Sequence, residues 1–251
     1  MIEVIILGYG NVGFHLTNAL DKASKVSVIQ VYNKNLSISN TDPIYTSSLH
    51  DLKKADVYII ALPDDTISMF SESLPFKDQL VVHTSGGVSL TELSERNKKG
   101  VFYPLQSFSK NQEVSFGNIP ICVEAESESD LKLLRDLGEA ISNKVVEINS
   151  EERAKLHLAA VFVNNFVNYL YTIADDLVNN SSLEFQLLQP LIEETAKKIK
   201  LLPAFVAQTG PAKRNDTQTI EKHLHLLKDS PYIGLYQEFT KAIQNTYGKK
   251  L

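Results

Sequence analysis

The sequence predicts an α/β fold, in which a doubly wound, mostly parallel sheet occupies residues 1–150 and an all-helical domain occupies residues 151–251. Strand-like and helix-like segments alternate through the first 150 residues, which is typical of a parallel sheet with helices on both faces. Residues 57–62 are apolar throughout, as in a central strand covered on both sides. After Ser150 the strand patterns give way to apolar residues at helical spacing, so the domain boundary is placed there.

The individual elements follow from these patterns. Strands are expected over short apolar runs at residues 3–7, 26–32, 57–62, 80–83, 101–102, 119–124 and 145–148. Helices are expected at residues 12–22, 131–141, 154–178, 183–202 and 217–227, with a last one after Pro231. Pro203 and the Gly210-Pro211 pair interrupt the helical region, because proline cannot continue a helix.

Composition narrows the class of protein. The net charge of −5 provides no basic field for a phosphate backbone, so nucleic-acid binding is not expected. No apolar stretch approaches the ~20 residues of a membrane span, and residues 1–7 are expected to form a first strand rather than a signal peptide. The single cysteine, Cys122, excludes an intrachain disulfide and fits a reducing, cytoplasmic location. Because Cys122 lies in an apolar run, it is interpreted as a small buried hydrophobe rather than a catalytic thiolate.

Residues 8–13 form a G-x-G-x-x-G motif that directly follows the first predicted strand and opens the first predicted helix. This context makes the motif a dinucleotide-binding fingerprint of the Rossmann type rather than a plain glycine turn. Gly8 permits the tight turn, Gly10 lets a pyrophosphate approach the backbone, and Gly13 allows the helix to pack against the strand. The free amides of the helix N-terminus, beginning at Asn11 and Val12, would receive the negative charge.

The position twenty residues after Gly13 indicates which dinucleotide binds. An NAD-binding protein usually has a carboxylate near this point, bonded to the ribose 2′-hydroxyl. This chain has Asn33 and Lys34 instead. An amide can donate to a 2′-phosphate and a lysine adds positive charge, so we predict NADP as the cofactor. The alternative for Lys34 is a solvated surface lysine, since lysine is a less specific phosphate ligand than arginine.

Two further loops are expected to face the cofactor, because ligands of such sheets lie beyond the carboxyl ends of the strands. One contains Pro63 and follows the strand at 57–62, and the other begins at His83 and includes Ser85. Ser85 is a candidate for binding the nicotinamide carboxamide or the substrate. The alternative is a serine-glycine turn beside a buried histidine.

Three stretches carry a resemblance to a known family: His83-Thr84-Ser85-Gly86, residues 103–108 (YPLQSF), and residues 210–216 (GPAKRND) followed by Thr219 and His223. With the glycine fingerprint, they resemble a bacterial family assigned to the NADP oxidoreductases. That family pairs a Rossmann-like domain with a helical domain of unassigned function. The first half also resembles pyrroline-carboxylate reductases, 6-phosphogluconate dehydrogenases and deazaflavin-dependent NADP oxidoreductases.

The resemblance implies NADP-dependent oxidoreduction and a homodimer formed through the helical domain. Small 2-oxo acids such as ketopantoate, or imines, are the substrates that it suggests, and a deazaflavin as second cofactor stays open. The chain departs from the family at Tyr103-Pro104, where His-Pro is common, so the resemblance carries no acid–base role to this position. Related dehydrogenases use a lysine one helical turn before an asparagine, whereas Val161 occupies that place before Asn165.

Polar residues that interrupt apolar helices are candidate catalytic residues. His157, Asn164 and Asn165 lie on the first predicted helix of the second domain, and Asn165 is about 80° from His157 around an ideal helix. His157 and Asn165 are candidates for proton transfer and substrate binding, or for a structural bond between helices. Arg214 is a candidate grip for a substrate carboxylate, or the partner of Asp216 in fixing a loop. Histidines 83, 157 and 223 lack the spacing of metal ligands, so no metal is expected.

These observations favour an NADP-dependent oxidoreductase that acts on a small, anionic metabolite. Ser85, His157, Asn165 and Arg214 are expected to converge near the nicotinamide. The alternative is a nucleotide-binding sensor or scaffold that keeps the fold without the catalysis, because fold does not determine function.

Overall fold

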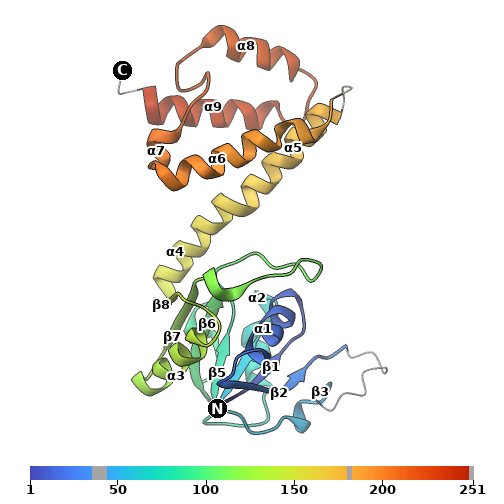
Figure 1. The fold of residues 1–251 in the computed structure, drawn as a ribbon, viewed down its shortest axis with the longest axis vertical. Helices are drawn as coiled ribbons and strands as arrows, with labels where there is room; N and C mark the ends of the chain where they lie inside the picture. The colour runs from blue at the N-terminus through green and yellow to red at the C-terminus, as the bar shows by residue number, and fades with distance from the viewer. Residues whose placement is uncertain (36–43, 180–182, 249–251) are drawn as a thin grey trace. The chain divides into compact units, whose positions relative to one another are not determined.

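The computed structural model describes residues 1–35, 44–179 and 183–248. The chain divides into two compact units, Met1–Phe166 and Val167–Leu251 (Figure 1). The predicted boundary residue, Ser150, is the first residue of helix α4 (Ser150–Ala160). None of the helices in the described ranges is both long and apolar enough to cross a membrane.

The described residues of the first unit form an eight-stranded sheet with the order β3-β2-β1-β4-β5-β6-β7-β8. Neighbouring strands are parallel throughout except β6 and β7, which are antiparallel. The expected α/β class is therefore confirmed, with one reversal of strand direction. The strands are β1 (Ile2–Leu7), β2 (Val26–Tyr32), β3 (Tyr45–Thr46), β4 (Val57–Ile60), β5 (Leu80–His83), β6 (Lys98–Pro104), β7 (Ile121–Ala125) and β8 (Val145–Glu147).

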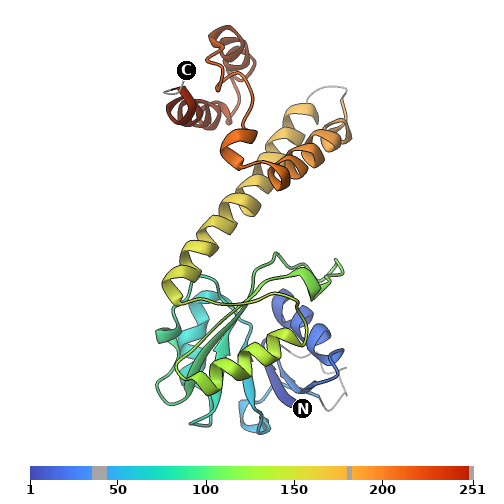
Figure 2. The same cartoon turned by 60° about the vertical axis from the view of Figure 1, so that its left-hand side comes forward.

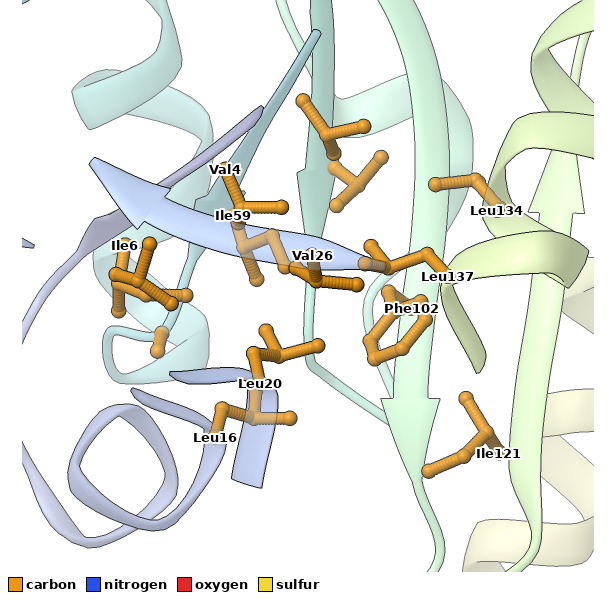
Figure 3. Packing of buried hydrophobic residues seen from close by; sticks show 14 of the residues in the cluster. Val4, Ile6, Leu16, Leu20, Val26, Ile59, Phe102, Ile121, Leu134 and Leu137 are labelled. Carbon is orange, nitrogen blue, oxygen red and sulfur yellow. The ribbon is translucent and has the colours of Figure 1, made fainter. Parts of the chain in front are cut away.

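Helices cover both faces of this sheet. They are α1 (Asn11–Asp21), α2 (Asp64–Glu72) and α3 (Glu128–Glu139), with short 3-10 turns η1 (Leu49–Asp51), η2 (Leu90–Glu92) and η3 (Phe116–Asn118). α1 and α3 pack on one face through Leu16, Leu20, Leu134 and Leu137, which meet alternate strand residues such as Ile59 (Figure 3). The other face packs Tyr58 and Ile60 against Ile67 of α2. Because successive strand residues point to opposite faces, the apolar run over β4 is buried on both sides.

The reversal between β6 and β7 decides which loops lie together. Pro104 pairs with Ile121, so the connection between these strands begins and ends at one edge of the sheet. The parallel strands β1, β4 and β5 also end at that edge, because they run in the direction of β6. The 105–120 segment therefore starts where the glycine loop and the loops after β4 and β5 lie.

Helical residues run from 150 to 179 as α4, the π-helix η4 (Val161–Phe166) and α5 (Val167–Asn179). The π turn was not expected, since apolar spacing alone does not distinguish it from an α turn. The second unit continues with η5 (Phe185–Leu188), α6 (Gln189–Leu201), α7 (Ala204–Ala207), α8 (Thr217–Leu226) and α9 (Ile233–Tyr247). These bounds lie close to the predicted ones, and the all-helical character of the second unit is confirmed in its described residues.

Candidate functional site

The glycine loop has the geometry of a dinucleotide cradle. Gly8 has a φ of +114°, and a side chain there would lie 2.5 Å from the Ala61 carbonyl oxygen. A side chain on Gly13 would come within 2.0 Å of the Gly8 oxygen, so only glycine lets α1 approach β1 this closely. A Cβ on Gly10, in contrast, would meet no atom within 4 Å. The backbone is thus close-packed beneath the loop and open above it, as a bound pyrophosphate requires.

The N-terminus of α1 is available for an anion. Its N-cap is Gly10, which provides no side-chain cap, and the first turn contains no acidic residue. The first amides, those of Asn11 and Val12, follow directly. Uncapped N–H groups and the helix dipole both favour negative charge here. The residues present therefore fit the pyrophosphate of a dinucleotide.

Asn33 and Lys34 lie where a ribose would be recognised. β1 pairs with β2 so that Leu7 is opposite Tyr32, and the Gly8 amide donates to the Tyr32 carbonyl oxygen at 2.8 Å. Asn33 is therefore next to the glycine loop, and its own amide is bonded to the Thr46 oxygen. Lys34 is exposed. No carboxylate stands at either position, so the chain lacks the carboxylate that usually accepts a hydrogen bond from the ribose 2′-hydroxyl.

His83 and Ser85 shape the turn after β5. The Ser85 amide donates to His83 Nδ1 at 3.1 Å, and Ser85 Oγ accepts bonds from the amides of Gly87 and Val88, both at 3.0 Å. Both side chains are buried. Burial and the nearby Arg153 charge lower the pKa of His83 to about 3, so the ring is neutral at physiological pH. The turn interpretation of these residues thus has direct geometric support, while a role of Ser85 toward substrate stays a prediction.

The turn after β5 also makes room for a second histidine. A Cβ on Gly86 would lie 2.5 Å from His157 Nδ1 and 2.8 Å from Tyr103 Cζ. A Cβ on Gly87 would lie 3.5 Å from Asp64 Oδ2. Since Asp64 begins α2 directly after Pro63, which is its N-cap, the loops after β4 and β5 and the end of β6 meet at one place. This convergence leaves no room for a side chain at Gly86, whereas a Cβ on Gly87 would make only ordinary van der Waals contact.

Tyr103 and His157 form a hydrogen-bonded pair at that place, with Tyr103 Oη 3.1 Å from His157 Nδ1. Burial, together with the nearby Cys122 and Asp64, raises the pKa of Tyr103 to about 12. Its hydroxyl is therefore protonated at physiological pH. The donor in this bond depends on the tautomer of the imidazole. If His157 Nδ1 carries the proton, the tyrosine O–H is free to donate to a third group.

The pair lines a pocket of about 560 Å³ within the first unit. Asn164 and Asn165 of η4 line the same pocket, as do Gln106 and Ser107. Two of the predicted residues, His157 and Asn165, are thus brought to one pocket. The 80° separation expected for them does not apply, because η4 is a π turn with fewer degrees per residue than an α turn. The side chains of Asn164 and Asn165 are exposed to solvent rather than buried against other helices.

A buried arginine fixes the beginning of α4. Arg153 is 1% exposed and forms an ion pair with Glu124 of β7 and a hydrogen bond to the Val88 oxygen. Ser150 Oγ bonds the same carboxylate at 2.9 Å and accepts from the Leu90 amide at 3.0 Å. His157 follows Arg153 by four residues, so both lie on the same side of α4. The Arg153 network therefore determines where His157 meets the sheet.

The remaining predicted residues belong to the second unit. Arg214 is exposed in the turn before α8. Within the described residues no ion pair joins it to Asp216, which instead caps α8 by accepting from Thr219. His223 Nδ1 is 2.8 Å from Tyr236 Oη. The convergence of Arg214 with the residues of the pocket stays a prediction.

In the described ranges no group of three potential ligands is placed to hold a metal.

From the sequence, Tyr103 is only a departure from the family, and Arg153 has no predicted role in the site. Tyr103 had a usable signal, because a tyrosine at the end of a parallel strand lies at the ligand edge of the sheet. Arg153 had none, since an arginine in the first turns of a helix is usually solvated and its burial depends on Glu124, 29 residues earlier.

The fold and the glycine cradle define a Rossmann-type, dinucleotide-binding class of protein with a helical second part. Comparison with protein families gives a match of residues 119–243 to a domain of unknown function, DUF2520. A Bacteroides fragilis protein assigned to the NADP oxidoreductases is 34% identical, with a TM-score of 0.87 over 97% of this chain and 98% of that one. The chain belongs to this DUF2520 family of proteins assigned to the NADP oxidoreductases.

More distant structures share the fold. A Thermotoga maritima protein is 23% identical, with a TM-score of 0.79 over 98% of this chain and 99% of that one. A reductive aminase from Aspergillus terreus, in complex with NADPH and ethyl levulinate, is 13% identical, with a TM-score of 0.69 over 100% of this chain and 95% of that one. No curated protein matches the sequence.

Proposed function

We propose that the protein is an NADP-dependent oxidoreductase that reduces a small, anionic carbonyl or imine compound, such as a 2-oxo acid, in the cytoplasm. The observation that carries this proposal is the Tyr103–His157 pair, which lines a pocket at the sheet edge where the glycine cradle also lies. The cofactor part is supported by the cradle, by the absence of a carboxylate at Asn33 and Lys34, and by the 34% identical relative assigned to the NADP oxidoreductases.

In the proposed reaction, Tyr103 acts as the proton donor and His157 as its hydrogen-bond partner. When bound, NADPH supplies a hydride to the carbonyl or imine carbon. Tyr103 donates the proton that the oxygen or nitrogen then requires, and its O–H bond breaks as the new O–H or N–H bond forms. A phenol with a pKa of about 12 stays protonated at pH 7 yet is more acidic than the alcohol it produces, so this transfer is favourable. His157 bonds the tyrosine oxygen and would stabilise its negative charge until it regains a proton.

A calorimetric titration with NADPH and NADH tests the cofactor assignment. We expect tighter binding of NADPH, because Asn33 and Lys34 can bond a 2′-phosphate and neither repels it. Gly10→Asp should abolish binding of both, since it puts a carboxylate where the pyrophosphate approaches the backbone. The variant should still fold, because a Cβ at Gly10 meets no neighbouring atom.

Gly234→Asp is the matched control. A Cβ there also meets no atom within 4 Å, and Gly234 likewise lies at the start of a helix, α9. This variant should bind both dinucleotides as the parent does. Preferential binding of NADH would overturn the NADP assignment, and a folded Gly10→Asp protein with unchanged affinity would exclude the glycine loop as the site.

A screen of 2-oxo acids and cyclic imines, followed by NADPH absorbance, tests the reaction. Turnover of an anionic member supports the proposed substrate class. If NADPH binds and no member of either class is turned over, the nucleotide-sensor alternative becomes the better description. The Tyr103–His157 pair favours the enzyme, because a sensor has no need of a proton donor beside the cofactor edge.

We also propose a homodimer formed through the helical part of the chain. The support is a set of apolar side chains that are exposed in the single chain, with Phe162 60% and Val163 72% exposed. Sedimentation analysis should give twice the mass of one chain. Phe162→Glu should weaken the dimer, whereas Met69→Glu, at an equally exposed apolar residue on α2, should not. A monomer at micromolar concentration would contradict the proposal.

A further inference from the structure

The segment between β6 and β7, residues 105–120, forms a strap attached to α1. His15 Nε2 on α1 lies 2.8 Å from the Ser109 carbonyl oxygen, and the ring of His15 packs against Phe108 at a centroid distance of 5.5 Å. Phe108 in turn stacks on Phe116, at the far end of the strap. Both ends of the strap lie at the ligand edge of the sheet, because Pro104 and Ile121 are paired there. The green strap can be followed beside the blue helix α1 in Figure 2.

These contacts bring one cation to the glycine loop. Lys110 Nζ donates a hydrogen bond to the carbonyl oxygen of Tyr9 at 2.6 Å. It also lies over the Tyr9 ring, 5.1 Å from the centroid, and 5.8 Å from the centroid of Phe14. Tyr9 is the residue between Gly8 and Gly10, so the ammonium group is held at the cradle itself.

Within the described residues, no carboxylate neutralises the charge of Lys110. Its partners are a carbonyl and two aromatic rings, and no ion pair within the described ranges includes it. An ammonium group has three N–H donors, and one is used by Tyr9. The first turn of α1 has no acidic residue that could compete for the others. A lysine that only fastened a loop would gain more from a carboxylate partner than from a carbonyl.

We propose that Lys110 binds the pyrophosphate of the dinucleotide and that the strap carries this residue to the glycine loop. This inference rests on the proposed function, because it assigns a further residue to the same cofactor site. The pyrophosphate is the part concerned, because the partner of Lys110 is inside the glycine loop. The 2′-phosphate is expected at Asn33 and Lys34, after β2. Lys110 therefore contributes to affinity for NADPH and NADH alike, whereas Lys34 contributes to the choice between them.

The test is calorimetric titration of NADPH and NADH into the full chain and its variants. Lys110→Gln should raise the Kd of both dinucleotides by about 10-fold or more, since a hydrogen bond between charged groups is lost. Lys110→Arg keeps the charge and should recover most of the affinity. Lys22→Gln removes the same charge from the opposite end of α1, where Lys22 is the exposed C-cap, and should change either Kd by less than about 2-fold.

Folding and salt dependence separate this role from loop fastening. Lys110 is exposed, so Lys110→Gln should keep the circular dichroism spectrum of the parent. Raising the salt concentration should weaken NADPH binding less in Lys110→Gln than in Lys110→Arg, because screening acts on the charge that was removed. Equal salt dependence, an unchanged Kd, or a loss confined to NADPH would overturn the assignment of Lys110 to the pyrophosphate. Failure of the parent chain to bind either dinucleotide would instead overturn the proposed function.

Discussion

Tyr103→Phe is expected to lower kcat by about 100-fold or more while leaving the Kd of NADPH within about 2-fold of the parent value. A positioned general acid typically contributes 10²- to 10⁴-fold, and this substitution removes the hydroxyl while keeping the ring. Tyr103 is 8% exposed and packs among Leu90, Val101 and Cys122, so phenylalanine fits without a cavity. The measurement is steady-state kinetics on a substrate found in the screen, with NADPH affinity obtained by calorimetry.

Tyr58→Phe controls for the loss of any buried tyrosine hydroxyl. Tyr58 is 2% exposed, and its hydroxyl donates to the Lys53 oxygen at 2.8 Å and accepts from the Ala55 amide, outside the pocket. This variant should lose stability and keep its kcat. Because the pKa of Tyr103 is about 12, its acid form is lost only as the pH rises toward that value. The parent kcat should therefore show no loss from this group between pH 7 and 10. A Tyr103→Phe variant with the parent kcat would exclude Tyr103 as the proton donor.

Arg153→Met is expected to lower the free energy of unfolding by about 3 to 5 kcal/mol, the usual cost of removing one partner of a buried ion pair. Methionine replaces much of the apolar volume, but it leaves the Glu124 carboxylate near the sheet without its cation. The Val88 carbonyl also loses a donor. Urea unfolding followed by circular dichroism measures the loss.

Arg135→Met is the matched control. Arg135 pairs with Glu147 at 3.0 Å, but the two side chains are 45% and 55% exposed. Solvent screens such a pair, so its loss should cost about 1 kcal/mol or less. Adding Glu124→Gln to Arg153→Met should recover part of the lost stability, because the uncompensated charge is then gone. Similar losses from the two arginine variants would show that burial of the Arg153 pair is not the cause.

The relation between these two predictions follows from the geometry of α4. Arg153 is a positioning residue: it does not line the Tyr103–His157 pocket, yet its bonds to Glu124 and to the Val88 carbonyl oxygen fix the turn that precedes His157. Its loss should therefore also reduce kcat, with a smaller effect on the Kd of NADPH. Tyr103→Phe should reduce kcat with little change in stability. The two variants thus separate proton donation from the placement of its partner.

The sheet was predictable wherever the apolar pattern is continuous. Residues 26–32 and 80–83 form β2 and β5 with the expected bounds. β6 is longer than expected because it begins with Lys98 and Lys99, and two consecutive lysines do not give the apolar pattern that predicts a strand. In the structure Lys99 is buried and pairs with Glu95 and Glu126, which makes its place in the strand favourable. The two-residue strand β3 was missed, since it exists only through its pairing with Val31 and Tyr32.

The fold class and the dinucleotide cradle could both be predicted from the amino-acid sequence alone. Both depend on local rules: hydrophobic periodicity for the elements, and steric limits at Gly8 and Gly13 for the loop. In contrast, long-range packing brings Tyr103 to His157, 54 residues later, and Lys110 to Tyr9, 101 residues earlier. These contacts depend on the reversed direction of β7 and on the buried Arg153 anchor. Strand direction and burial are set by the packing of the whole sheet, so no local pattern could have placed the proton donor beside its partner or the cation at the glycine loop.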